Sequence, residues 1–240
     1  MMLGKTKNTP TMKNSTNNIG DWVLEKNNQF IAFNKPFGIP VQEDKTGDTS
    51  LINLAEIYTK KKLFLCNRID RPASGIVLFA KNKGALESIN KQFQFRTIDK
   101  KYLCIVEKRP VKDEDTLTHW IEKNGKINKS FIVDQKGGNS AEAKLSYKLI
   151  GKSDRYFLLE IQLFTGKHHQ IRCQLSHIGC PIKGDVKYGA RRSNKDKSIH
   201  LHAWKTIVAH PISKKKVHIV APVPEDNLWK FFEETIAEKK

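Results

Sequence analysis

The 240-residue sequence lacks any apolar run long enough to cross a membrane, because a spanning helix needs about 18 or more consecutive apolar residues. Its opening stretch, MMLGKTKNTPTMKNSTNN, has lysines but no apolar segment, which is unlike a secretory signal. We expect residues 1–18 to form a disordered basic tail, since they have too little apolar surface to bury. The remaining residues, 19–240, have the size of one domain, because domains average roughly 100–200 residues.

Cysteine is scarce, and none of the four cysteines belongs to a CxxC pair. Together with the missing export signal, this favours reduced thiols in a cytoplasmic protein. The sequence also lacks internal repeats and a glycine-rich phosphate loop. We therefore expect neither a repeat architecture nor a phosphate-loop nucleotide site.

One set of potential metal ligands occurs late in the chain, where His169, Cys173, His177 and Cys180 recur at helical spacing. On one helix these four would spread over roughly 16 Å, at about 1.5 Å per residue. Zinc ligands, in contrast, must all lie about 2.0–2.3 Å from a single ion. We therefore expect no metal site and predict that this stripe faces the core.

Negative charge is scarce relative to positive charge. Lysine and arginine total 43 against 25 aspartate and glutamate residues, which gives a net charge of +18. Such an excess favours a polyanionic partner, because each neutralised phosphate releases counterions. Charge alone does not separate a nucleic-acid-binding protein from a merely soluble basic one.

Helical and strand patterns are mixed along the chain, and several strands are joined as hairpins. This mixture indicates an α+β fold with a largely antiparallel sheet. We predict strands within 22–41, after Gly75, over 100–109, as a hairpin over 142–164, and around Trp204 and Val217. Helices are predicted after Ser50 and after Asn82, over 168–179, and from Asn227 to Glu238 with Leu228, Phe231, Phe232 and Thr235 facing inward.

The segment LCNRIDRPASGIVLFAK, residues 65–81, places Asp70 between Arg68 and Arg71, just ahead of an apolar strand. An aspartate in such a place is usually a turn residue. However, a loop at a strand end is also where functional residues gather. The adjacent guanidinium groups would favour the ionised carboxylate that a nucleophile or base requires.

A second segment, TGKHHQIRCQLSHIGCPIKGDVKYG at 165–189, is rich in hydrogen-bond donors. Within it, Arg172 either extends to solvent or pairs with an anion in the interior, for which Asp70 is a candidate.

These segments belong to a wider resemblance. Over about residues 22–230 the chain resembles the RluA-type family of RNA pseudouridine synthases. The family's motifs appear in order as NKPFGIPV at 34–41, NRIDRPASG at 67–75, KKYL at 100–103, TGKHHQIR at 165–172, GCPIKGDVKYG at 179–189 and LHA at 201–203.

The resemblance implies the pseudouridine synthase catalytic domain, a long, mixed, mostly antiparallel sheet flanked by helices and crossed by a basic RNA-binding cleft. It implies that Asp70 is the catalytic aspartate, that Tyr102 stacks on the target uracil and that Arg172 is the basic partner of Asp70. Arg68 matches the arginine that helps to displace the uridine from the RNA stack. No cofactor and no metal is implied. The further residues expected to contact RNA are Arg71, Lys35, Lys167, His169 and Gln170.

We therefore expect an enzyme that isomerises uridine in tRNA or rRNA, acting as a monomer. The main alternative is a non-catalytic RNA-binding or ribosome-assembly protein, which would need the basic surface but not Asp70, Tyr102 and Arg172 together. A third hypothesis is a hydrolase that acts on nucleosides or sugars through catalytic carboxylates. Such an enzyme would usually need a second carboxylate besides Asp70. Asp185 is the nearby candidate, and we interpret it instead as a structural loop residue. Three positions depart from the family pattern: Asn67 replaces His, Ala73 replaces Thr and Gln174 replaces His.

Overall fold

The computed structural model describes residues 18–239, so the tail expected over residues 1–18 lies outside the described residues except for Asn18. The elements are η1 Ile19–Trp22, β1 Val23–Lys26, β2 Phe30–Lys35, α1 Leu51–Thr59, β3 Phe64–Leu65, β4 Ser74–Ala80, α2 Lys83–Gln94, β5 Asp99–Val106, β6 Glu114–Asn124, β7 Lys129–Val133, β8 Ala141–Lys152, β9 Phe157–Leu163, α3 Gln170–His177, η2 Val186–Tyr188, β10 Leu201–Ala209, β11 Lys216–Val220, α4 Asn227–Phe231 and α5 Glu233–Ala237.

All the strands of the described residues join one eleven-stranded sheet. Its main path runs β1-β2-β4-β10-β5-β9-β8-β6-β7, with β3 paired to β4 and β11 paired to β10. Every pairing is antiparallel except that of β4 with β10. The expected α+β fold with a mostly antiparallel sheet is therefore confirmed.

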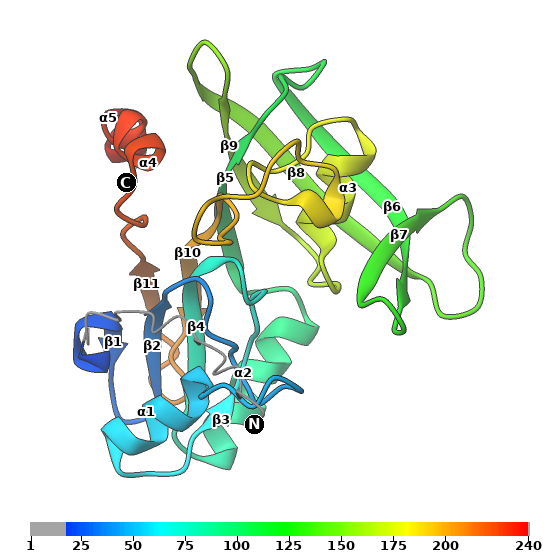
Figure 1. The fold of residues 1–240 in the computed structure, drawn as a ribbon. Helices are drawn as coiled ribbons and strands as arrows, with labels where there is room; N and C mark the ends of the chain where they lie inside the picture. The colour runs from blue at the N-terminus through cyan, green and yellow to red at the C-terminus, as the bar shows by residue number, and fades with distance from the viewer. Residues whose placement is uncertain (1–17, 240) are drawn as a thin grey trace, which may run out of the picture.

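Strand β10 forks between two neighbours on one of its edges. Its first residues pair with β4, at His202 with Ser74 and at Ala203 with Gly75. From Lys205 onward it pairs with β11 instead. Figure 1 shows the consequence: β5 and β10 connect a lower half of the sheet, with β1, β2, β4, α1 and α2, to an upper half, with β6 to β9 and α3.

Local sequence explains where the helices begin. The N-cap Ser50 of α1 accepts a bond from the backbone of Asn53, whose side chain binds back to the backbone of Ser50 in a capping box. Asn82 caps α2 through the backbone N–H of Ala85. Such caps satisfy N–H groups that have no partner within the helix, so both predicted helix starts are confirmed.

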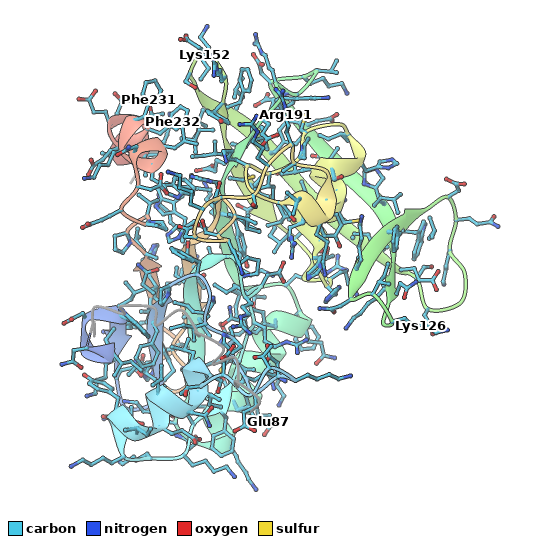
Figure 2. All side chains as sticks on the ribbon, viewed as in Figure 1. Glu87, Lys126, Lys152, Arg191, Phe231 and Phe232 are labelled. Atoms are coloured by element: carbon cyan, nitrogen blue, oxygen red, sulfur yellow. The ribbon has the colours of Figure 1, made fainter. Side chains whose placement is uncertain are left out.

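The final helix differs from the prediction. It is broken at Phe232 into α4 and α5, and its buried residues are Trp229, Phe232 and Ile236. Phe231 is 61% exposed, while its neighbour Phe232 is buried. Both are labelled on the C-terminal helix in Figure 2. Because Phe231 and Phe232 are consecutive, the sequence pattern did not show which of them faces the core. In the structure Phe232 does, since it packs beside Gly151 and in the core cluster that contains Trp204.

The structure also bears on the His/Cys stripe late in the chain and on the expectations of no metal site and no membrane span. Cys173 and Cys180 are buried as predicted, but His177 of the same stripe is exposed. Among residues 18–239, no three His, Cys, Asp or Glu side chains gather as a metal site would require. Over the same residues, no helix has the length and apolar character needed to cross a membrane.

Candidate functional site

Asp70 begins a tight turn immediately before β4. The N–H of Ala73 donates to the Asp70 carbonyl at 3.0 Å, which closes the turn. The carbonyl of Arg71 accepts from the N–H of Gly38 at 2.8 Å, and that of Pro72 accepts from Ile199 at 3.1 Å. Because these backbone carbonyl groups all have hydrogen-bond donors, the turn is fixed and holds the Asp70 carboxylate in one place. The Asp70 side chain remains 24% exposed.

Lys35 supports this turn from below and does not face RNA. Its side chain is 0% exposed, and its ammonium lies within hydrogen-bond distance of four carbonyl oxygens, those of Pro36, Ile39, Arg71 and Ala73. Burial lowers the pKa of Lys35 to about 7. The expectation that Lys35 binds RNA is wrong, because a fully buried ammonium cannot reach a phosphate.

Arg71 turns away from its neighbour Asp70. Its guanidinium binds the Gly38 carbonyl at 2.8 Å and forms ion pairs with Asp44 at 3.5 Å and with Asp48. Arg71 therefore fastens the loop before α1 to the turn. The sequence-based expectation that Arg71 helps to hold Asp70 ionised is not what the structure shows.

Arg172, on the buried face of α3, provides the positive charge at Asp70. Its Nη1 donates to Asp70 Oδ2 at 3.0 Å. Its Nε and Nη2 donate to the two oxygens of Asp185 at 2.7 and 2.8 Å, and the guanidinium lies 4.9 Å from the centre of the Tyr188 ring. The expected pairing of Arg172 with Asp70 is confirmed.

Burial alone would lower the pKa of Arg172, but its hydrogen bonds to Asp185 and the charge of Asp70 raise it overall. The guanidinium is therefore a permanent charge shared by two carboxylates. Asp185, interpreted from the sequence as a loop residue, is the bidentate anchor of Arg172. The GD motif was the available signal, but a motif carries no information on the distance between Asp185 and Arg172.

Tyr102 lies on β5, directly across from Ala203 on β10, and Ala203 in turn lies opposite Gly75 on β4. This register brings Tyr102 to the strand-end region that carries Asp70. Its ring packs between the two main clusters of the core. Burial and then the charge of Asp70 raise the pKa of the Tyr102 phenol, so the hydroxyl stays protonated near neutral pH.

The other residues expected to bind RNA fall into two groups. Arg68 and Lys167 are exposed, as a contact with RNA requires. Gln170 is buried, and its amide bonds to Thr165, to the backbone of Lys144 and Lys167, and to Gln174. The prediction that Gln170 contacts RNA is therefore wrong.

His169 is buried beside Asp70, with its Nε2 3.9 Å from Asp70 Oδ2. Its backbone is left-handed, with φ of 51°, and it immediately precedes α3. Its ring stacks on that of His168 at a centroid distance of 3.7 Å. His169 thus belongs to the surroundings of the carboxylate rather than to an outer phosphate-binding surface.

The three departures from the family pattern each have a structural account. Asn67 binds the backbone of β4 twice, at Ile76 and Leu78. Ala73 is 2% exposed and packs in the core cluster that contains Leu201. Gln174 is fully buried and donates to the carbonyls of Leu117 and Ala143.

Hollows of about 580 and 600 Å³ lie elsewhere on the molecule and do not include Asp70. The first lies on strands β5, β6, β8 and β9, and the second lies between α4 and the loop 193–198. Exposed basic side chains near the His168–His169 pair beside Asp70 include those of Arg68, Lys123 and Lys187.

Known proteins are similar to this chain in sequence and in fold. A family model described as RNA pseudouridylate synthase matches residues 29–177. The chain is 35% identical over 234 residues to the ribosomal large subunit pseudouridine synthase C of Buchnera aphidicola subsp. Schizaphis graminum, covering 90% of this chain and 70% of that one. It is 30% identical over 209 residues to the protein of the same name from Rickettsia bellii, covering 85% and 69%.

Among solved structures, human RNA pseudouridylate synthase domain containing 4 has a similar fold, with a TM-score of 0.70 at 23% identity over 91% of this chain and 93% of that one. The fold, the family model and the relatives all indicate the same family as the motifs in the sequence. The chain therefore belongs to the family of RNA pseudouridylate synthases, isomerases that convert uridine in RNA into pseudouridine.

Proposed function

We propose that Asp70 is the catalytic carboxylate of this isomerase and that Arg172 is its positively charged partner. The observation that carries the proposal is the 3.0 Å bond from the buried Arg172 guanidinium to Asp70 Oδ2, in a site where 24% of the Asp70 side chain still reaches solvent. An adjacent opposite charge favours the ionised carboxylate. A protein that only binds RNA gains nothing from a carboxylate at this place, because it repels phosphate.

The reaction breaks the bond between ribose C1′ and uracil N1 and forms a bond between C1′ and uracil C5. The proton on C5 leaves and N1 gains one, so no atom is added to the product. Asp70 can attack the ribose, attack the ring or first act as a base. Each route starts from the unprotonated carboxylate, whose Oδ2 accepts the hydrogen bond from Arg172.

The target base must leave the RNA stack before Asp70 can reach it, at a cost of a few kcal/mol. We assign the displacement to Arg68, which is exposed two residues before Asp70. We assign the stacking platform to Tyr102, because a base on an aromatic ring recovers about 1–3 kcal/mol. Lys167 is assigned to the phosphate backbone, where a lysine adds affinity without reading sequence.

The substrate proposed here is a stem-loop of large-subunit ribosomal RNA. The relatives named ribosomal large subunit pseudouridine synthase C support this choice over tRNA. Residues 19–240 would act as one catalytic domain, as a cytoplasmic monomer, with RNA held across a basic cleft beside Asp70.

The test is release of tritium from RNA labelled at uracil C5, with ribosomal RNA and tRNA assayed separately. Wild-type protein should release tritium from unmodified large-subunit RNA. Asp70→Asn should reduce release to background while binding the same RNA with similar affinity, since it removes a charge and keeps the shape. Release from tRNA alone would overturn the choice of substrate, and an active Asp70→Asn variant would overturn the role of Asp70.

The alternative, a non-catalytic ribosome-assembly protein, predicts a different outcome. Wild-type protein would then bind ribosomal RNA tightly and release no tritium from either RNA pool.

A further inference from the structure

His169 lies between Asp70 and a buried tyrosine. Its Nδ1 is 3.0 Å from the Tyr188 hydroxyl, and its Nε2 faces Asp70 Oδ2 at 3.9 Å. Tyr188 is only 4% exposed, and its ring meets that of His169 edge-on. A neutral imidazole carries one proton, so the nitrogen that holds it decides what Asp70 faces.

The direction of the hydrogen bonds follows from a neighbouring backbone group. The N–H of Ser130 donates to the Tyr188 hydroxyl oxygen at 2.8 Å, and a backbone N–H can only donate. The Tyr188 proton then needs an acceptor of its own, and within residues 18–239 the one acceptor bonded to this hydroxyl is His169 Nδ1. Because a buried hydroxyl without an acceptor is costly, Tyr188 donates to Nδ1, which leaves the ring proton on Nε2.

The surroundings keep this imidazole neutral. Burial, followed by the charges of Arg172, His168, Lys187 and Lys123, lowers the pKa of His169 to about 2. The opposing charge facing the ring is that of Asp70. The approach of His169 to Asp70 is therefore that of a neutral N–H donor to a carboxylate rather than an ion pair.

We propose that His169 is a further functional residue, a neutral donor aimed at Oδ2 of Asp70, and that Tyr188 is the positioning residue that fixes its tautomer. The inference rests on the proposed role of Asp70. The opposite tautomer would point a lone pair at the carboxylate. Since hydrogen bonds of a free active site often tighten when substrate binds, we expect the 3.9 Å separation between His169 Nε2 and Asp70 Oδ2 to shorten in the RNA complex.

This arrangement also distinguishes the two oxygens of Asp70. Arg172 and His169 both face Oδ2, whereas Oδ1 has no hydrogen-bond partner within the described part of the chain. Oδ1 is therefore the oxygen that remains for the substrate.

The tautomer can be read directly by long-range proton–nitrogen NMR of the imidazole ring in the full-length protein at neutral pH. We expect His169 of the wild type to carry its proton on Nε2. In Tyr188→Phe the hydroxyl donor is gone, so we expect some or all of the population to move the proton to Nδ1. A wild-type ring protonated on Nδ1 would overturn the inference, whatever the activity of the enzyme.

The kinetic test compares two tyrosines that are equally buried, each 4% exposed. Tyr188→Phe should lower kcat about tenfold with KM for RNA changed less than twofold, since one oriented hydrogen bond is lost. Tyr147→Phe, a change on β8 that removes a hydroxyl bond to the carbonyl of Lys112, should keep the wild-type kcat. Equal effects of the two variants would reduce Tyr188 to a packing residue.

These results remain distinguishable from failure of the proposed function. If Asp70→Asn stays active, the role of Asp70 is lost, but the tautomer of His169 is still measured. If Asp70→Asn is inactive and Tyr188→Phe behaves as the wild type, only the inference on His169 and Tyr188 fails.

Discussion

At the scale of single residues, the site depends on how one guanidinium is divided between two carboxylates. Asp185 is almost fully buried and takes two of the bonds of Arg172, while Asp70 is partly exposed and takes one. Removing one partner of a buried ion pair leaves an uncompensated charge, whereas a partly exposed pair is weaker. The two aspartates should therefore contribute unequally to stability.

We expect Asp185→Asn to lower the free energy of unfolding by about 3 kcal/mol, and Asp70→Asn by about 1 kcal/mol or less. Urea denaturation of the two variants, which make the same chemical change, measures the difference. Equal losses would show that Arg172 does not depend on Asp185 as its anchor.

The sequence motifs identified some residues of the site correctly and misplaced others. Asp70, Tyr102 and Arg172 stood out because their motifs are specific, and the structure brings Asp70 and Arg172 into contact. Lys35 and Gln170 were misjudged because a motif gives residue type but not burial. Lysine and glutamine are usually exposed, and here both are enclosed by backbone and side-chain partners.

At the scale of elements, the starts of α1 and α2 were predicted correctly because their capping residues, Ser50 and Asn82, are local signals. The hairpin β6–β7 was not predicted, although it forms one edge of the sheet. The parallel pairing of β4 with β10 is also invisible in a single sequence, because it joins segments more than a hundred residues apart. Where those two strands meet, glycine is required.

Gly75 has a φ of +111°, and a Cβ at this position would lie 2.3 Å from the Ala203 carbonyl oxygen and 2.5 Å from its nitrogen. We expect Gly75→Ala to cost more than 3 kcal/mol of stability or to prevent folding, because both backbone strain and a clash with a fixed strand oppose it. Thermal denaturation followed by circular dichroism measures the loss.

Gly179→Ala is the matched control, because Gly179 also has a positive φ, +76°, but its Cβ would meet nothing within 4 Å. We expect a loss of about 1 kcal/mol there, from backbone strain alone. A Gly75→Ala variant no less stable than Gly179→Ala would contradict the close approach of β4 and β10.

At the scale of the whole molecule, the two halves of the sheet meet at β10, and the site lies at this seam. His202 is buried there and connects three segments. Its Nδ1 lies 2.8 Å from the Ser74 hydroxyl on β4, and its Nε2 lies 3.3 Å from the Ala221 carbonyl after β11. Since the carbonyl can only accept, Nε2 carries the proton and Nδ1 accepts from Ser74, so the seam requires a neutral ring.

This requirement predicts a specific loss of stability in acid. Burial lowers the pKa of His202 to about 4, from an ordinary 6.5, against a raising contribution from its bond to Ala221. Between these two values the unfolded chain binds a proton that the native protein does not, so stability is full above pH 6.5 and falls as the pH drops towards 4. At about 1.36 kcal/mol per pH unit, the loss due to His202 is about 3 kcal/mol.

Urea denaturation from pH 7.5 to 4 of wild type and His202→Gln isolates this contribution, because the other titrating groups are common to both proteins. We expect the variant to be less stable at pH 7.5 and to lose about 3 kcal/mol less than the wild type on acidification. His218→Gln, at an exposed position on β11, controls for removal of an imidazole as such. If His202→Gln retained the full wild-type pH dependence, the acid sensitivity would arise elsewhere than at the seam that joins the Asp70 turn to the rest of the sheet.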